Sequence, residues 1–97
     1  MRGLNGKTAI VTGGASGIGR AISLRLGEEG IAVGILDLYD EKAREVAKKI
    51  EKNGGKATSK VCDISDYNLV QKATSEIEAI NGATDILVNN AGWDKAA

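Results

Sequence analysis

Residues 12–19 read Thr-Gly-Gly-Ala-Ser-Gly-Ile-Gly, and their neighbours on both sides make this the stretch that decides the fold. Before it, residues 7–12 form a short apolar run with β-branched members, which is too short for a helix and predicts a buried strand. After it, apolar residues recur at helical spacing from Gly17 until Gly30, where a left-handed residue can end a helix. The stretch is therefore predicted to connect the first strand to the first helix. The apolar side chains expected on the inner face of that helix are Ile18, Ala21, Ile22 and Leu26.

The rest of the chain repeats this alternation of strand and helix. Further strands are expected at residues 31–37, 56–61 and 85–89. A second helix is expected to be capped by Asp40 and to end at Asn53-Gly54-Gly55; its inner face carries Ala43, Val46, Ala47 and Ile50. A third is expected to be capped by Ser65, with Asp66 in its first turn, and to end at Asn81-Gly82; its inner face carries Val70, Ala73, Ile77 and Ile80.

Strands that alternate with helices indicate an α/β fold with parallel strands and right-handed crossovers. The second strand is apolar on both faces, as in a strand that helices cover on both sides. The third alternates with polar residues and is expected at an edge. No linker, repeat or low-complexity segment interrupts the pattern, so residues 1–97 are expected to form one domain.

Composition narrows the class of protein. The chain has 13 basic and 13 acidic residues, so its net charge gives no attraction to nucleic acid or to an anionic membrane. No apolar run approaches the ~18 residues of a membrane span, and the first residues do not resemble a signal peptide. Cys62 is the only cysteine and is expected to pack in the core, so no disulfide forms within the chain and a reducing cytoplasm is expected.

The glycine-rich turn is a candidate phosphate site, because the start of a helix presents free N–H groups and a positive dipole end. Gly13 would permit the tight turn, Gly17 would let the backbone approach a pyrophosphate, and Gly19 would let the helix pack close to the sheet. The spacing is G-x-x-x-G-x-G instead of the general G-x-G-x-x-G. A P-loop is disfavoured, because Arg20 follows Gly19 where that motif needs lysine. A glycine-rich connection without a ligand stays open as the alternative.

Asp37 ends the second strand, 24 residues after Gly13. In such folds an acid about 20 residues beyond the glycine-rich turn binds the adenosine ribose. Its charge would repel a 2′-phosphate, and the next residue is Leu38 instead of the arginine or lysine that meets this phosphate. The sequence therefore favours NAD over NADP as the cofactor. The alternative is that Asp37 only begins a solvated turn.

Three motifs in this order resemble the short-chain dehydrogenase/reductase family. Residues 12–19 match the family's T-G-x-x-x-G-I-G motif, and residues 89–92 match its N-N-A-G motif. Cys62-Asp63-Ile64 is similar to the acid-bearing turn that meets adenine in that family. The resemblance covers essentially the whole chain but only the first half of a typical member.

The resemblance implies a role for each matching residue. The pyrophosphate would be held by Gly13, Ser16, Gly17, Ile18 and Gly19. Asp37 would hold the adenosine ribose with Leu38 beside it, Asp63 would meet the adenine amino group, and Ile64 would pack on the ring. Asn90, Ala91 and Gly92 would line the floor under the ribose, and Asn89 would tie the central strands together. Without the family, the alternatives are that Asp63 is a simple turn acid and that Asn90 with Gly92 is an ordinary strand end.

The family's catalytic serine and Y-x-x-x-K pair have no match here. Tyr39 is followed four residues later by Ala43, and Tyr67 by Gln71. No histidine is present to form a rival catalytic set, and neither catalytic nor metal-binding residues are expected. We expect a truncated or designed NAD-binding fragment that is inactive alone. The alternatives are one part of a split NAD-dependent oxidoreductase and an assembly module with an unused pocket.

The family's topology implies half of a doubly wound Rossmann fold, a four-stranded parallel sheet of order 3-2-1-4 with three helices. The fourth strand would then be an unguarded edge, and only the third helix would cover its face of the sheet. Such an edge is a template for pairing, and an open apolar face commonly marks an interface. We therefore expect a homodimer through the fourth strand and the third helix.

Overall fold

The computed structural model describes residues 6–90, in which strands and helices alternate throughout. The elements are β1 Thr8–Thr12, α1 Gly17–Glu28, β2 Ala32–Asp37, α2 Asp40–Lys52, β3 Ala57–Val61, α3 Tyr67–Asn81 and β4 Ile86–Asn89. Each expected strand and helix is present, and the strand boundaries differ from the expected ones by no more than a residue or so. Within the described residues, no helix combines the length and apolar character that crossing a membrane requires.

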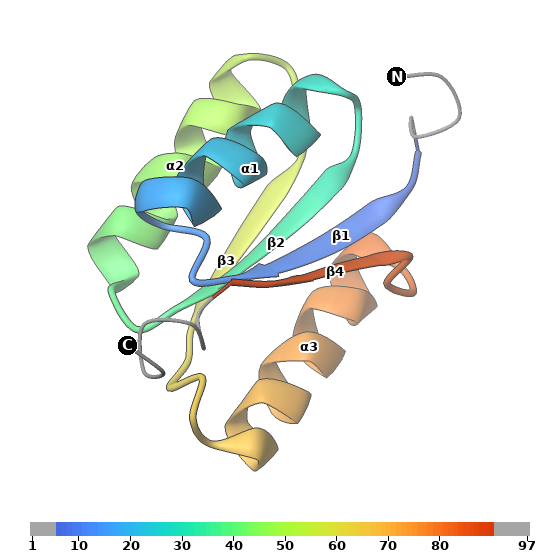
Figure 1. Ribbon diagram of the computed structural model, residues 1–97. Helices are drawn as coiled ribbons and strands as arrows, with labels where there is room; N and C mark the ends of the chain where they lie inside the picture. The colour runs from blue at the N-terminus through green and yellow to red at the C-terminus, as the bar shows by residue number, and fades with distance from the viewer. Residues whose placement is uncertain (1–5, 91–97) are drawn as a thin grey trace.

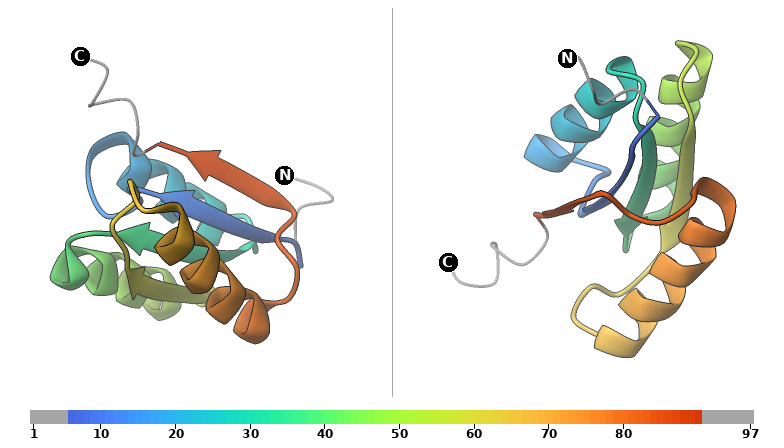
Figure 2. Two further views of the ribbon diagram at one scale, coloured as in Figure 1. Left: turned by 90° about the horizontal axis from the view of Figure 1, so that it is seen from below. Right: turned by 90° about the vertical axis from the view of Figure 1, so that its right-hand side faces the viewer.

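The four strands form one parallel sheet in the order β3-β2-β1-β4, as expected (Figure 1). Helices α1 and α2 cover one face of this sheet, and α3 covers the other (Figure 2). The fold is thus the three-layer Rossmann-type arrangement, with β3 and β4 as the two edges of the described sheet.

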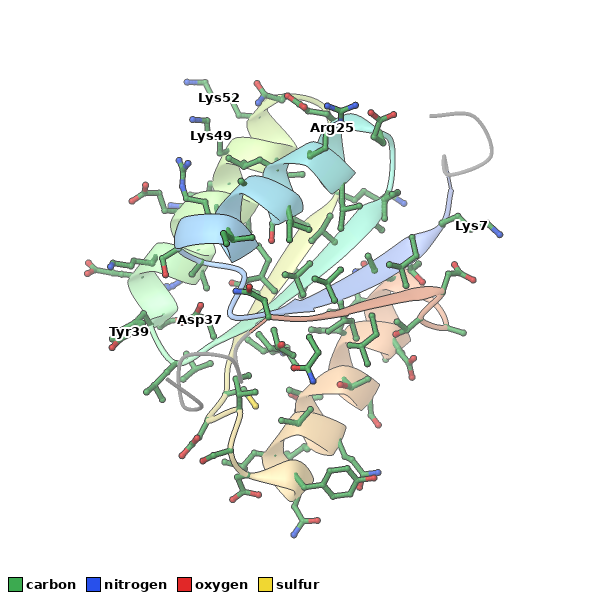
Figure 3. All side chains as sticks on the ribbon, in the orientation of Figure 1. Lys7, Arg25, Asp37, Tyr39, Lys49 and Lys52 are labelled. Carbon is green, nitrogen blue, oxygen red and sulfur yellow. The ribbon has the colours of Figure 1, made fainter. Side chains whose placement is uncertain are left out.

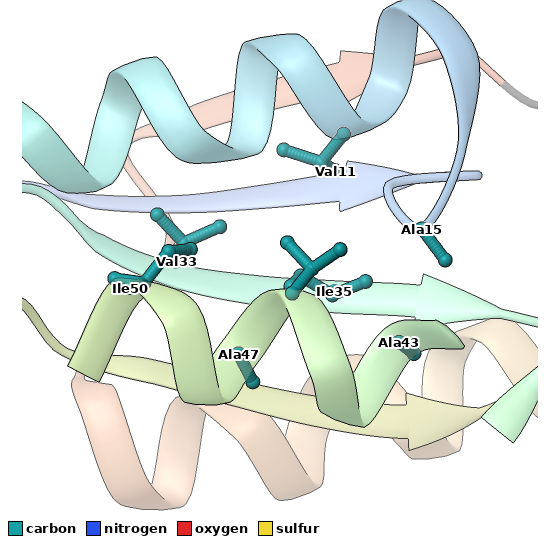
Figure 4. Packing of buried hydrophobic residues seen from close by; sticks show 8 residues of the cluster. Val11, Ala15, Val33, Ile35, Ala43, Ala47 and Ile50 are labelled. Carbon is teal, nitrogen blue, oxygen red and sulfur yellow. The ribbon is translucent and has the colours of Figure 1, made fainter. Parts of the chain in front are cut away.

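The larger core lies between the sheet and helices α1 and α2 (Figure 4). Its buried residues are Val11, Ala15, Val33, Ile35, Ala43, Val46, Ala47 and Ile50. All four residues expected on the inner face of α2 are therefore buried.

The expected inner face of α1 is wrong for two of its four residues, Ile18 and Ala21. The buried residues of α1 are Gly19, Ser23 and Gly27, whereas Ile18 is 72% exposed and Ala21 is also exposed. The reason is close packing, because a Cβ on Gly27 would lie 2.7 Å from Cγ2 of Ile50 in α2. The other two expected residues, Ile22 and Leu26, are partly buried and flank this line of small residues.

The smaller core lies between the sheet and α3 and consists of Ile10, Leu36, Cys62, Ala73 and Ile77. Cys62 packs here as expected, and burial raises the pKa of its thiol. Ile80, which was expected to face this core, is instead 64% exposed. Leu87 of β4 is 67% exposed, so the α3 side of the sheet is only partly covered near β4.

Two expected helix caps are displaced by one residue. The N-cap of α3 is Asp66, whose Oδ1 accepts hydrogen bonds from the backbone N–H groups of Asn68 and Leu69. The hydroxyl of Ser65 donates instead to Asp63 over 2.6 Å. The N-cap of α2 is Tyr39, which makes no side-chain cap bond, and Asp40 is the first helical residue and pairs with Arg44. An acid in the first turn still complements the helix dipole.

Candidate functional site

The carboxyl ends of β1, β2 and β4 lie together at one end of the strands, which we call the carboxyl edge of the sheet. The turn between β1 and α1 also lies there (Figure 1). β1 lies between β2 and β4, and the connections to these two neighbours pass over opposite faces of the sheet. Such a topological switch point is where open α/β sheets bind their ligands.

The turn begins with a glycine that needs its conformational freedom. Gly13 has φ 66°, in the left-handed region, and its N–H donates to the Leu36 carbonyl over 2.7 Å. Gly19 is required by its contact with this same turn, since a Cβ there would lie 2.0 Å from the Gly13 carbonyl oxygen. The close approach that Gly19 permits is therefore between α1 and the turn, and not between α1 and the sheet as we expected.

The first turn of α1 is open. Ser16 is its N-cap in an extended conformation, makes no side-chain cap hydrogen bond, and is followed by no acidic residue in the first turn. Gly17 has φ 56°, and among residues 6–90 nothing lies within 4 Å of the position that its Cβ would occupy. In α3, by contrast, the Asp66 side chain accepts hydrogen bonds from N–H groups of the first turn. The N–H groups and positive dipole end of α1 are thus accessible to an anion.

Sequence reasoning missed Gly14 and Ser23, which hold the turn against α1. Ser23 is fully buried, and its Oγ lies 2.9 Å from the Gly19 carbonyl oxygen and 3.2 Å from that of Gly14. A Cβ on Gly14 would come within 2.8 Å of this hydroxyl. The available signal was a small polar residue midway between Gly19 and Gly27, four residues from each.

Asp37 is buried at the end of β2, with 6% of its surface exposed, so it does not begin a solvated turn. Its Oδ2 accepts a hydrogen bond from the Ala15 N–H over 3.0 Å, and its Oδ1 accepts one from the Tyr39 N–H over 3.0 Å. The next two side chains, Leu38 and Tyr39, are 58% and 61% exposed. The site thus carries one buried carboxylate beside the turn and apolar side chains outside it.

The basic residues in the last turns of α1 and α2 lie far from this site, whereas Arg20 follows Gly19 directly in α1. Figure 3 shows Asp37 and Tyr39 at one end of the molecule, and Arg25, Lys49 and Lys52 at the other. These three cations belong to the last turns of their helices, where positive charge is favourable. Lys42 does lie on the near side, with its ammonium 5.5 Å from the centre of the Tyr39 ring.

The end of β4 is joined to the same turn. The Thr12 hydroxyl lies 3.0 Å from Asn89 Oδ1, so Asn89 ties β4 to β1 as expected. The backbone N–H of Asn90 donates to the Thr12 hydroxyl, and the Asn90 side-chain amide donates to the Gly13 carbonyl over 3.3 Å. Asn90 therefore lies beside the glycine-rich turn. Ala91 and Gly92, which were expected to continue this floor, fall outside the described residues.

Asp63 and Ile64 follow β3, one strand further out than Asp37. Asp63 is exposed, and its Oδ1 accepts hydrogen bonds from both the N–H and the hydroxyl of Ser65. Ile64 is half-buried and packs against the core beneath α3. Both residues follow the carboxyl end of β3, at the same end of the sheet as Asp37.

The sequence comparisons agree with this geometry. A family model described as short chain dehydrogenase matches residues 7–97. A short chain dehydrogenase of Pseudocercospora fijiensis is 43% identical over 89 residues, which cover 92% of this chain and 29% of the relative. The uncharacterized oxidoreductase YxbG of Bacillus subtilis is 42% identical over 95 residues, which cover 98% of this chain and 35% of the relative. The chain thus spans about a third of the length of these curated relatives.

Solved structures match as well. A metagenomic short-chain oxidoreductase in complex with NADP aligns with a TM-score of 0.84 and 40% identity, over 91% of this chain and 40% of that one. An NAD⁺-bound xylitol dehydrogenase aligns with a TM-score of 0.88 and 36% identity, over 94% of this chain and 35% of that one. The same architecture therefore accompanies both forms of the dinucleotide among these structures.

Proposed function

Because the chain belongs to the short chain dehydrogenase family, whose model matches residues 7–97, we propose that it binds a nicotinamide dinucleotide at the open end of α1. The observation that carries this proposal is the uncapped first turn of α1, which lies at the switch point of the sheet with an open approach to Gly17. Backbone N–H groups and the helix dipole would together hold the pyrophosphate. The chain is then the cofactor-binding part of an oxidoreductase fold.

The remaining roles follow from the position of each residue along the edge. The pyrophosphate would lie on Gly13, Ser16, Gly17, Ile18 and Gly19. The adenosine ribose would bind Asp37 beside Leu38, and the adenine would lie towards Asp63 and Ile64. Asn90, with Ala91 and Gly92, would form the floor under the ribose. Exposed Ile18 supports this arrangement, because an apolar side chain beside an uncapped helix end gains from being covered by a ligand.

We propose that the cofactor is NAD in preference to NADP. The buried Asp37 carboxylate would repel a 2′-phosphate, and the two residues that follow it are Leu38 and Tyr39. Isothermal titration calorimetry with NAD and NADP tests this, and the expected result is tighter binding of NAD. Asp37→Ala should reduce the preference. Equal or tighter binding of NADP to the unmodified protein would show that Asp37 does not select the cofactor.

A second candidate function is a self-associating module. Leu87 on the edge strand β4 and Ile80 on α3 are 67% and 64% exposed, on the face that α3 only partly covers. We propose that a second copy covers them in a homodimer centred on β4 and α3, because closed two-fold pairing hides both an open edge and an apolar face. If the dimer forms but neither dinucleotide binds, the chain is an assembly module with an unused pocket.

The location that suits this protein is a reducing compartment, and we propose the cytoplasm. The one cysteine of the sequence, Cys62, is buried as a free thiol within the core beneath α3. A buried free thiol fits a compartment in which thiols are kept reduced.

A further inference from the structure

Gly13, Gly14 and Ala15, in the turn between β1 and α1, are held by hydrogen bonds with β2, with α1 and with Asn90. The hydrogen bonds run from Gly13 N–H to Leu36 O, from the Asn90 side-chain amide to Gly13 O, from the Ser23 hydroxyl to Gly14 O, and from Ala15 N–H to Asp37 Oδ2. Among these partners only Asp37 is a carboxylate. The helix end begins directly after Ala15, with Ser16 as the N-cap of α1 and Gly17 as its first residue. Ala15 is therefore the last residue before the proposed anion site.

The bond between Asp37 and Ala15 is buried on both sides. Asp37 is 6% exposed and Ala15 is 3% exposed, and the donor and acceptor atoms are 3.0 Å apart. A hydrogen bond to a charged acceptor is roughly twice as strong as one between neutral groups. Removing the acceptor would leave the Ala15 N–H buried without a partner, and the turn would move to satisfy it.

We propose that Asp37 is a positioning residue for the pyrophosphate site as well as a ligand of the ribose. Through Ala15 its carboxylate fixes the turn, and the turn fixes the direction of the N–H groups from Ser16 to Gly19. Both roles fit one carboxylate, because its two oxygens offer about four acceptor positions and the Ala15 and Tyr39 N–H groups use two of them. This proposal rests on the proposed function, since it concerns the same site.

The two roles predict opposite effects on an anion that has no ribose. If Asp37 only selects the ribose, removing its negative charge lowers the repulsion of a nearby anion and strengthens binding. If Asp37 positions the turn, removing its carboxylate weakens the binding of the same anion. Inorganic pyrophosphate is therefore the informative probe.

The test is a calorimetric titration of inorganic pyrophosphate into the 97-residue protein and two variants. Asp37→Asn should bind about tenfold more weakly than the unmodified protein, as expected from a charged hydrogen bond. Asp40→Asn is the matched control, because it removes a charge three residues beyond β2 from a side chain that pairs with Arg44 instead of the turn. The control should bind as well as the unmodified protein or slightly better. Unchanged or tighter binding by Asp37→Asn would overturn the proposal.

A second measurement does not depend on binding, and its first part needs no variant. Nuclear magnetic resonance of the unmodified protein should show a through-hydrogen-bond coupling between the Ala15 amide nitrogen and the Asp37 carboxyl carbon. In Asp37→Asn, amide hydrogen exchange at Ala15 should be about tenfold faster, with no such change in Asp40→Asn. Absence of the coupling overturns the positioning role even if NAD binds. If neither NAD nor pyrophosphate binds, the proposed function fails, and the coupling and exchange data still decide the positioning role.

Discussion

Two glycines in the same turn of α1 serve opposite purposes. Gly17 faces open space and has a left-handed φ of 56°, so a side chain there would occupy the approach to the helix end. Gly19 faces the Gly13 carbonyl at 2.0 Å from its hypothetical Cβ, so a side chain there would displace the turn itself. Substitution of Gly17 therefore tests the ligand site, whereas substitution of Gly19 tests the fold.

Gly17→Ala should weaken NAD binding at least tenfold, because the methyl group would stand where the pyrophosphate approaches the backbone. Its left-handed φ also strains alanine, at a cost of about 1–2 kcal/mol in stability. Gly54→Ala is the matched control, since Gly54 has φ 93° and nothing within 4 Å of its Cβ position, but lies after α2. The two variants should lose similar stability in urea unfolding, and only Gly17→Ala should lose affinity in calorimetry. Equal NAD affinities would place the ligand elsewhere.

Helices show where sequence pattern succeeds and where it fails. In α2, spacing alone identified the four buried residues, because large apolar side chains make the contact with the sheet. In α1, the buried residues are Gly19, Ser23 and Gly27, and large apolar residues only flank them. A search for large apolar residues at helical spacing does not identify such a line of small residues. The strands were predictable from their alternation with helices, and their order was predicted from the resemblance to the family.

In the candidate site, too, some features were predictable from the sequence and others depend on close packing. The motif residues around the turn, Asp37 and Asn90, were identified from their positions in the sequence, and the structure brings them to one edge. The bonds from Asp37 to Ala15 and from Ser23 to Gly14 were not predicted, because they join positions whose proximity depends on how closely α1 and β2 approach the turn. The sequence motifs predicted the ligand class, whereas the packing of small residues that supports the turn was visible only in the structure.

The cap of α3 gives a direct test of its first turn. Asp66→Ala should lower the free energy of unfolding by about 1 kcal/mol, because two backbone N–H groups lose their acceptor. Ser65→Ala is the comparison, since its hydroxyl bonds to Asp63 and caps no helix N–H group. Urea unfolding of both variants checks the assignment. A larger loss for Ser65→Ala than for Asp66→Ala would restore Ser65 as the cap.

The connection from α3 to β4 should make stability depend on pH. Hydrogen bonds from Thr84 lower the pKa of Glu78, including one from the Thr84 N–H over 2.9 Å. Because its folded pKa lies below the unfolded one, Glu78 contributes stability above the unfolded pKa and loses it as the pH falls through the folded pKa. Thermal unfolding should therefore show Glu78→Gln destabilised near neutral pH, and the difference should shrink in acid. A difference that grows in acid would contradict this sign.

The sheet has two edge strands, β3 and β4, and the dimer interface is proposed at β4 alone. The same substitution on each strand therefore gives a matched test of the dimer. Leu87→Lys places a charge on β4 at the proposed interface, so light scattering should show a shift from dimer to monomer. Val61→Lys makes the same change on β3, where the side chain is 55% exposed and no interface is proposed. This control should remain dimeric. A monomer at high concentration in the unmodified protein, or equal effects of both lysines, would remove the dimer proposal.

Binding without turnover is the expected behaviour of the 97-residue chain. Neither tyrosine has a lysine four residues later, so the chain supplies no Y-x-x-x-K pair for acid–base chemistry. Absorbance at the NADH band should stay constant with alcohol or ketone substrates. Adding a polypeptide that carries the second half of a family member should produce turnover if the chain is one part of a split enzyme. Steady turnover by the repurified chain alone would show that another set of residues is catalytic.

The pairing of β1 with β4 also has a consequence for the order of events during synthesis. β1 emerges first from the ribosome, yet one of its two neighbours is β4, and contacts such as that between Thr8 and Asp85 join residues 77 positions apart. At translation rates of about 5–20 residues per second, the nascent β1 waits roughly 4–15 s for that neighbour. During this time β1, β2 and β3 can assemble beneath α1 and α2, while the central strand keeps one side unpaired. The nascent chain is therefore most in need of chaperone protection along β1, the strand that the finished fold buries most completely.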